Sequence, residues 1–277
     1  MQRTPVTVYD PTNRLPFPNN RIPASRVDSA SRGLAELIPI PNFNVPIQNY
    51  QFITGVPQNG QNLSARFSRS ITRKDRFSVN QTWRTQDGVS AQLFGFLDDS
   101  DSGGWSTDLS WTHNTTPRLI QTIRGRFTRN TSTQLPYFAN RRNVAAELGI
   151  NGASQDPINW GPPNLSFTNF GALRDGTPSS RRDLQINLNA GWNWVHKKHT
   201  IGFGGDIARN RLNVRTESNA RGSFTFSGLA TSAFDAQGTP VAASGYDYAD
   251  FLLGLPQSSS IRFGSASNYY RSWNYNG

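Results

Sequence analysis

The stretch that decides the fold is DLQINLNAGWNWVHKKHTIGFGGDI, residues 183–207. Apolar side chains occupy every second position from Leu184 to Trp194, and Asn, Gln and Asp occupy most positions between them. After the polar turn His196–His199, the alternation resumes from Ile201 onward. A period of two places successive side chains on opposite faces of a strand. Two such runs joined by a short turn predict a β-hairpin with one apolar and one polar face.

The same pattern occurs twice earlier in the chain. One alternating pair of runs surrounds the turn at Thr72–Asp75, and a second pair surrounds Asn114–Pro117. The segments that connect these hairpins on the opposite side are long, and they comprise 84–104, 130–182 and the region after residue 212. Short turns on one side and long loops on the other are typical of outer-membrane barrels, whose strands cross with only about 10 residues. We therefore predict an all-β fold, part of an antiparallel up-and-down transmembrane β-barrel.

The whole chain, residues 1–277, is assigned to this partial barrel. Its clear hairpins cover 61–129 and 183–211, while 1–60, 130–182 and 212–260 are long loops. The first of these loops is rich in Pro and Asn, with a helical turn near Ser29–Leu37. In this arrangement Asn, Arg and Ser of the polar face line the lumen, and the loops 84–104 and 130–182 are extracellular. Residues expected to contact lipid are the leucines, Ile186, Phe203 and the strand-end Trp.

Composition agrees with a β protein that has long loops. Charged residues are only 17% of the 277, whereas Gly (24), Pro (17) and aromatic residues are plentiful. The chain has no Cys, which excludes disulfides and Cys-based metal sites. No apolar run of about 18 residues is present, so no transmembrane helix is predicted. Met1–Pro5 lacks the apolar segment of a signal peptide, and we therefore expect an internal fragment.

The formal net charge is +10, which raises the question of nucleic-acid binding. The arginines are scattered over strands and loops, and no block of like charges occurs. This distribution disfavours a nucleic-acid partner. Attraction to anionic lipid head groups or to an anionic ligand is at least as well supported.

Three motifs with some chemical content are better explained by structure. The pair His196 and His199 has no third metal ligand nearby and fits a solvated turn. Asp98–Gly104 offers oxygen ligands but lacks the EF-hand spacing, and a flexible acidic loop tip is the preferred interpretation. Gly202–Gly205 lies in a strand and is no dinucleotide fingerprint, so it indicates a tightly packed or bent strand. The sequence thus offers no candidate catalytic, cofactor-binding or metal-binding residue, and we expect no enzyme.

The loop 130–182 carries aromatic residues, namely Tyr137, Phe138 and Trp160. They suit either stacking on sugars or other ligands, or packing of the loops onto one another. Asn143–Ile150 is expected to form a short helix in this loop.

Six segments, in the same order, resemble Oar-like TonB-dependent outer-membrane receptors. They are Tyr9–Arg26 (YDPTNRLPFPNNRIPASR), Pro39–Asn42 with Asn49–Tyr50, Thr72–Asp75, His199–Asp206, Ala220–Gly228 and Asp250–Pro256. Each phrase alone is weak, but together they cover almost the whole chain. The regulatory-like domain, the TonB-contacting segment and the plug of that family have no counterpart here, and a plugged barrel of about 22 strands needs more strands.

This resemblance implies a receptor fragment in the cell outer membrane that contributes to solute binding and uptake. Its implied partners are outer-membrane lipid, an unidentified extracellular solute and, through absent parts of the receptor, the TonB complex. The alternative is a secreted all-β carbohydrate-binding or adhesion module. Such a module would fold alone in water, whereas barrel strands expose an apolar face and unpaired edges.

Overall fold

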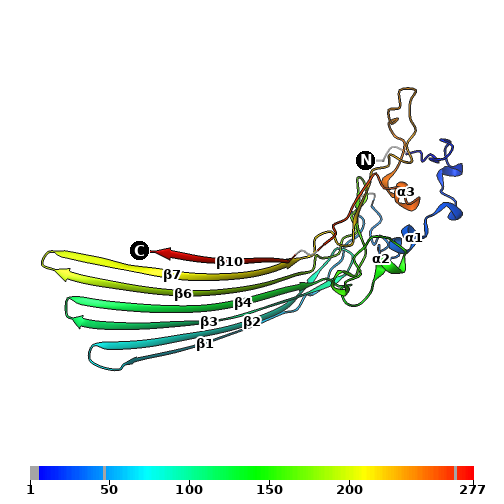
Figure 1. Ribbon diagram of the computed structural model, residues 1–277. Helices are drawn as coiled ribbons and strands as arrows, with labels where there is room; N and C mark the ends of the chain where they lie inside the picture. The colour runs from blue at the N-terminus through cyan, green and yellow to red at the C-terminus, as the bar shows by residue number, and fades with distance from the viewer. Residues whose placement is uncertain (1–5, 46–47, 265–266) are drawn as a thin grey trace.

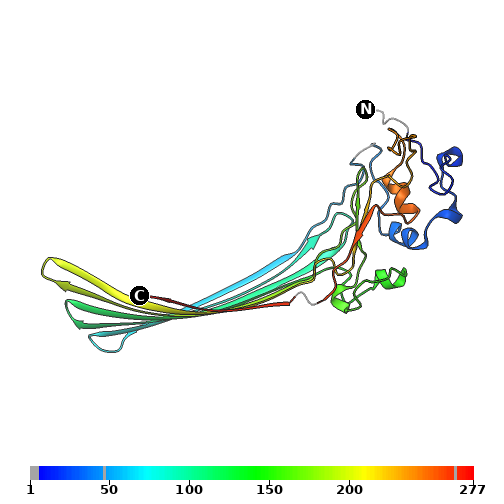
Figure 2. The ribbon, with the colours of Figure 1, turned by 45° about the horizontal axis from the view of Figure 1, so that its top comes forward.

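The computed structural model describes residues 6–45, 48–264 and 267–277. In these residues, one long antiparallel sheet extends from a compact cap (Figure 1). Its hydrogen-bonded order is β1-β2-β3-β4-β6-β7-β10. The strands are β1 (Gln58–Ser70), β2 (Asp75–Ala91), β3 (Leu97–Thr116), β4 (Leu119–Leu135), β6 (Ser179–His196), β7 (His199–Thr216) and β10 (Ser267–Asn276). The all-β antiparallel prediction is confirmed, and the sheet twists along its length (Figure 2).

The three predicted hairpins are present, and their turns lie together at the end of the sheet remote from the cap (Figure 1). These turns are 71–74, 117–118 and 197–198. The prediction of a long loop at 84–104 is wrong, because β2 and β3 continue through it and only 92–96 connects them. Its Asp, Ser and Gly residues have low β propensity, but hydrogen bonding to strands on both sides outweighs that preference.

The cross-strand register assigns every strand residue to one of two faces. Directly paired residues point to the same side of a sheet, so a row can be followed from β1 to β10. One such row is Phe67, Val79, Leu109, Gly125, Leu188, Ile207 and Tyr275. The neighbouring row is Ser68, Ser78, Ser110, Arg124, Asn189, Asp206 and Asn276. We call the side with the first row the apolar face and the side with the second row the polar face.

The apolar face has the height of a membrane. Ten residue steps separate Leu184 from Trp194 along β6, or ~33 Å at ~3.3 Å per residue. A strand tilt of about 40° reduces this to ~25 Å, the height of the apolar band of outer-membrane barrels. Six of the seven Trp lie on this face: Trp83, Trp105, Trp111, Trp192, Trp194 and Trp273. The predicted facing of Leu184, Ile186 and Phe203 agrees with this register.

The long connections fold together into the cap instead of forming separate loops. The described residues before β1, residues 136–178 between β4 and β6, and residues 217–264 between β7 and β10 contribute to it (Figure 1). Its regular elements are η1 (Pro18–Asn20), η2 (Ala24–Arg26), α1 (Ser29–Ala35), α2 (Val144–Glu147), η3 (Pro157–Asn159), β5 (Asn164–Phe167), β8 (Ser223–Phe226), α3 (Asp247–Leu252) and β9 (Ser258–Ser260). The helices α1 and α2 fall in the predicted stretches 29–37 and 143–150.

The cap has a hydrophobic core of its own. Its buried members come from all three connections: Leu34, Phe138, Val144, Leu165, Leu173, Phe226 and Phe251. Phe251 of α3 is fully buried and forms edge contacts with Phe167 and Phe226 at 5.5 Å between ring centroids. No helix of the described segments is long and apolar enough to cross a membrane.

The sheet is open in the described residues. It begins at β1 and finishes at β10, and both of these edge strands run from the cap toward the hairpin turns. Antiparallel pairing needs neighbours that run in opposite directions. These two edges therefore cannot close on each other with antiparallel pairing.

Candidate functional site: the polar face of the sheet

The polar face is built from side chains that form hydrogen bonds with water or polar groups and are unfavourable in contact with lipid. The row nearest the middle of the face is Ser64, Thr82, Ser106, Thr128, Gln185, Asn210 and Ser272. Not one apolar side chain interrupts this row across seven strands. Such a surface belongs in contact with water or a polar solute, because desolvation of these groups without new partners costs free energy.

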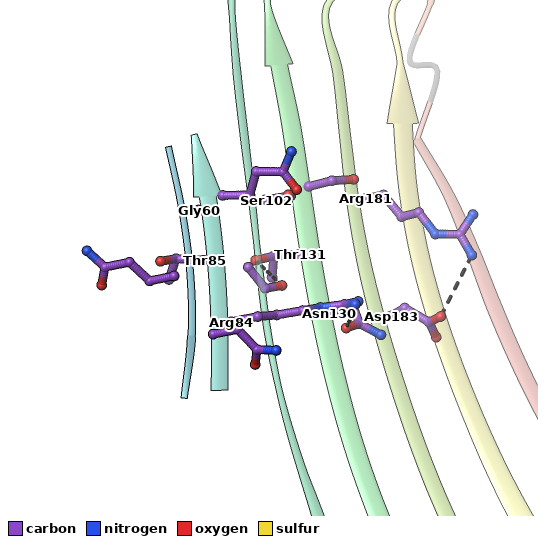
Figure 3. A pocket seen from close by; sticks show the side chains of 13 residues that line it. Gly60, Arg84, Thr85, Ser102, Asn130, Thr131, Arg181 and Asp183 are labelled. Carbon is purple, nitrogen blue, oxygen red and sulfur yellow. Dashed lines mark hydrogen bonds and ion pairs between the residues drawn. The ribbon is translucent and has the colours of Figure 1, made fainter. Parts of the chain in front are cut away.

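A hollow lies on the polar face next to the cap. It has a volume of about 580 Å³ and is lined from β1, β2, β3, β4 and β6. Arg84 donates to the side-chain oxygen of Asn130 at 3.0 Å, and Arg181 forms an ion pair with Asp183 at 3.7 Å (Figure 3). This volume is in the range of small-ligand sites. The hollow therefore combines two guanidinium groups with amide and carboxylate oxygens.

Positive charge exceeds negative charge along this face. Between the row of Gln58 and the hairpin turns, six arginines and three aspartates point to it, a formal excess of three positive charges. They are Arg66, Arg76, Arg84, Arg124, Arg126 and Arg181, and Asp108, Asp183 and Asp206. Arg126 and Asp108 form a direct ion pair in the next hollow along the face. Low-dielectric walls strengthen the electric field of such a surface, and the positive field attracts anions or polar solutes.

Buried charges join two connections of the cap to each other. Arg221 is paired with Asp175, and both side chains are almost fully buried. Arg221 also donates to the carbonyl oxygens of Gly176 and Trp160. The pKa of Asp175 is raised to about 6, because burial raises it, Arg221 only partly opposes this rise, and the nearby Asp98 carboxylate adds to it. These contacts order the connections and lie away from the polar-face hollow.

The sequence profile of a family described as outer membrane beta barrel domain matches residues 1–277, the entire chain. The chain belongs to this family. The prediction of an outer-membrane location is thereby confirmed, and the protein is an outer-membrane β-barrel protein. No curated protein and no solved structure gives a significant match.

The positions of the motifs considered as possible metal or dinucleotide sites agree with membership of this barrel family. His196 and His199 close the β6–β7 hairpin in an exposed turn, as predicted. A Cβ on Gly204 would lie 2.4 Å from the carbonyl oxygen of Ala190, so this strand pair is tightly packed. In the part of the chain that the structure describes, no group of three or more His, Cys, Asp or Glu could hold a metal ion.

The interpretation of Asp98–Gly104 as a flexible acidic loop tip is wrong. These residues belong to β3, and Asp98 is fully buried beneath the cap. Its carboxylate accepts from the side chain of Gln92 at 2.5 Å and from the backbone N–H of Tyr137 at 3.0 Å. The buried carboxylate is thus a structural acceptor that fixes the start of the 136–178 connection.

The loop aromatics of the barrel mainly pack the cap. Phe138 is buried, and Tyr137 lies against it and against Phe96 at 5.0 and 5.7 Å between ring centroids. The indole N–H of Trp160 donates to the backbone of Gln155 at 3.2 Å. Of the two interpretations, packing of the connections onto one another accounts for these contacts.

Two of the six segments quoted from the sequence, Tyr9–Arg26 as the first and Asp250–Pro256 as the last, supply contacts that hold the cap. In the first, Arg26 forms two hydrogen bonds with Asp10 at 2.8 and 2.9 Å, and this pair lowers the pKa of Asp10 to about 2. In the last, Asp250 accepts from the backbone N–H and the hydroxyl of Thr231 at 2.9 and 2.6 Å. Burial nevertheless raises the pKa of Asp250.

Sequence reasoning missed the polar-face hollow. Its charged residues Arg84, Arg181 and Asp183 come from β2 and β6, which are three places apart in the sheet order. No local motif connects such residues. The only signal was the period of two, which assigns each residue to a face but does not give the register between strands.

Proposed function

We propose that the protein contributes strands and extracellular entrance to the barrel of an Oar-like TonB-dependent receptor, which binds a solute outside and admits it across the outer membrane. The observation that supports this most is the polar face, with its unbroken row of polar side chains from Ser64 to Ser272, opposite a membrane-high apolar face. In a closed barrel the polar face lines the lumen. The hollow at Arg84 and Arg181 then lies just below the extracellular cap, where an entering solute arrives first.

The expected solute is polar and carries hydrogen-bond acceptors or negative charge. The excess of arginines on the polar face supports this class, because guanidinium groups bind carboxylate and phosphate in bidentate geometry. We propose no catalytic role, and nucleic acid is not proposed as a partner. The TonB complex enters the proposal only through the resemblance of the sequence segments. The secreted carbohydrate-binding alternative loses its basis, because the chain belongs to an outer-membrane family.

The experiment uses single cysteines, because the natural chain has none. Ser110→Cys lies on the polar face, and Leu109→Cys lies beside it on the apolar face. A water-soluble maleimide is added to intact cells with working or abolished energy coupling to the outer membrane. If the lumen is gated, Ser110→Cys should react faster with the maleimide in energised cells. Leu109→Cys should stay protected from the reagent with and without energy coupling.

Each other result argues against the proposal. Equal labelling of Ser110→Cys with and without energy coupling would indicate a passive barrel rather than a TonB-dependent receptor. Rapid labelling of Leu109→Cys by the water-soluble reagent would show that the apolar face is not in lipid. A lipid-soluble maleimide serves as the positive control for the thiol at residue 109.

A further inference from the structure

Five arginines lie together on the apolar face, where polar side chains are least expected. They are Arg129 of β4, Arg182 of β6, Arg209 and Arg211 of β7, and Arg271 of β10. The register runs from Arg129 through Leu184 to Arg211 and Arg271, so three of them share one row. The other two lie one row above and one row below. We call these five residues the arginine patch.

The arginine patch is compact and lies at the cap-side edge of the apolar band. Neighbouring strands are ~4.8 Å apart, so four strands span ~14 Å. The row of Arg211 also contains Trp83 and Trp105, the tryptophans that mark this edge of the band. In an outer-membrane barrel this edge lies at the lipid head groups of the cap-side leaflet.

No acidic residue shares the three rows of the arginine patch on its four strands. In the described part of the chain, Arg129, Arg182 and Arg211 form no hydrogen bond or ion pair through their guanidinium groups. The remaining apolar-face positions of the same three rows on these strands are Thr131, Asn213, Tyr269, Leu184, Phe127, Ile186 and Trp273. None of them is acidic. On the polar face, by contrast, Arg126 is paired with Asp108.

Aromatic rings hold two of the arginines at the surface. The guanidinium carbon of Arg209 lies 4.9 Å from the ring centroid of Trp273, and that of Arg271 lies 5.9 Å from the ring centroid of Tyr269. Arg271 also donates to the side-chain oxygen of Asn213 at 2.8 Å. Such rings are amphipathic and favour the membrane interface, while long cationic side chains extend their charge toward it.

Unpaired guanidinium groups at the edge of the hydrocarbon region are costly unless an anion neutralises them. Phosphate is the anion that arginine binds best, because its oxygens match the planar fork of donors. We propose that the arginine patch is a binding site for the phosphate groups of an anionic lipid in the cap-side leaflet. Family membership supplies the membrane location but no lipid site, and the patch faces away from the polar-face hollow. The inference therefore stands independently of solute uptake.

The test uses the intact protein extracted from its own outer membrane in a neutral detergent. Binding of a bisphosphorylated diglucosamine lipid is measured by native mass spectrometry, beside the same lipid without phosphates and beside inorganic phosphate. The triple variant Arg209→Gln, Arg211→Gln and Arg271→Gln should bind the phosphorylated lipid at least ~10-fold more weakly, since each basic residue near an anionic surface contributes to attraction. Replacement by Lys at the same positions should restore much of the affinity.

The matched control removes three positive charges from the opposite face, through Arg66→Gln, Arg76→Gln and Arg124→Gln. It should leave lipid binding within about twofold of the parent. Heat-modifiable mobility in gels reports that each variant keeps its barrel. Equal loss in the control, or equal binding of the lipid without phosphates, would overturn the proposal. Displacement of the lipid by inorganic phosphate at equal concentration would overturn the assignment to a lipid.

Discussion

Leu188→Arg tests the assignment of the two faces most directly. Leu188 lies on the apolar face of β6, half exposed, in the row with Val79, Leu109 and Ile207. It is four residues from Leu184 and six from Trp194, and therefore close to the middle of the apolar band. A charged side chain there faces hydrocarbon without a partner. The expected cost is about 2–4 kcal/mol near the bilayer midplane.

Position along the strand should change this cost. Leu184→Arg lies at the edge of the same band, where the penalty falls to ~0–1 kcal/mol. Asn189→Arg is the matched control, because it adds the same charge one residue away on the polar face. We therefore expect Leu188→Arg to be much more disruptive than either of the other two variants.

The assay is reversible folding of the full-length protein into lipid vesicles, followed by denaturant titration of Trp fluorescence. The free energy of unfolding in the membrane gives the cost of each variant relative to the parent. Assembly of the same variants in the outer membrane of cells provides an independent measurement. If Leu188→Arg assembled as well as the parent while Asn189→Arg did not, the faces would be reversed and the reasoning from register refuted.

Three further predictions concern the cap and one strand contact. Phe251→Ala should destabilise the cap by about 3–5 kcal/mol, measured by proteolysis of the cap with the sheet intact; unchanged protease resistance would contradict the cap core. Burial raises the pKa of Asp175 from 3.8 to about 6, so its contribution to cap stability is complete below pH 4 and is lost as pH rises through 6. Fluorescence of Trp160, which lies in the cap, reports unfolding of the cap. Asp175→Asn should flatten the dependence of cap stability on pH between pH 4 and 6; an equal pH dependence in the variant would assign it to other groups. Gly204→Val should cost about 1–3 kcal/mol in the same vesicle titration, because its Cβ meets the carbonyl oxygen of Ala190; a neutral effect would mean that β6 and β7 separate easily there.

Local periodicity was sufficient to predict the hairpins and the two faces. The alternation from Leu184 to Trp194 depends on nothing beyond the strand itself, and hydrogen-bonded neighbours only extend it. The same reasoning failed at Asp98–Gly104, where acidic and small residues resemble a loop. Pairing with β2 and β4 and the burial of Asp98 under the cap decide the structure there, and both come from residues distant in sequence.

Neither the cap nor the candidate site could be predicted from local sequence, because both depend on contacts between residues that are distant in the chain. Phe138, Leu165 and Phe251 form one core although more than a hundred residues separate the first from the last. The hollow similarly depends on register across five strands, which no single segment encodes. Composition and spacing could therefore predict that long connections exist, but not that they fold together.

The direction of the two edge strands also limits how this sheet can be assembled. When two copies stand the same way up in a membrane, β10 of one and β1 of the other run in the same direction, just as they do within one copy. A ring of any number of copies would therefore contain a parallel seam at every junction. An all-antiparallel ring requires an odd number of strands of other sequence between those edges. Copies of this sheet alone therefore cannot form an all-antiparallel barrel.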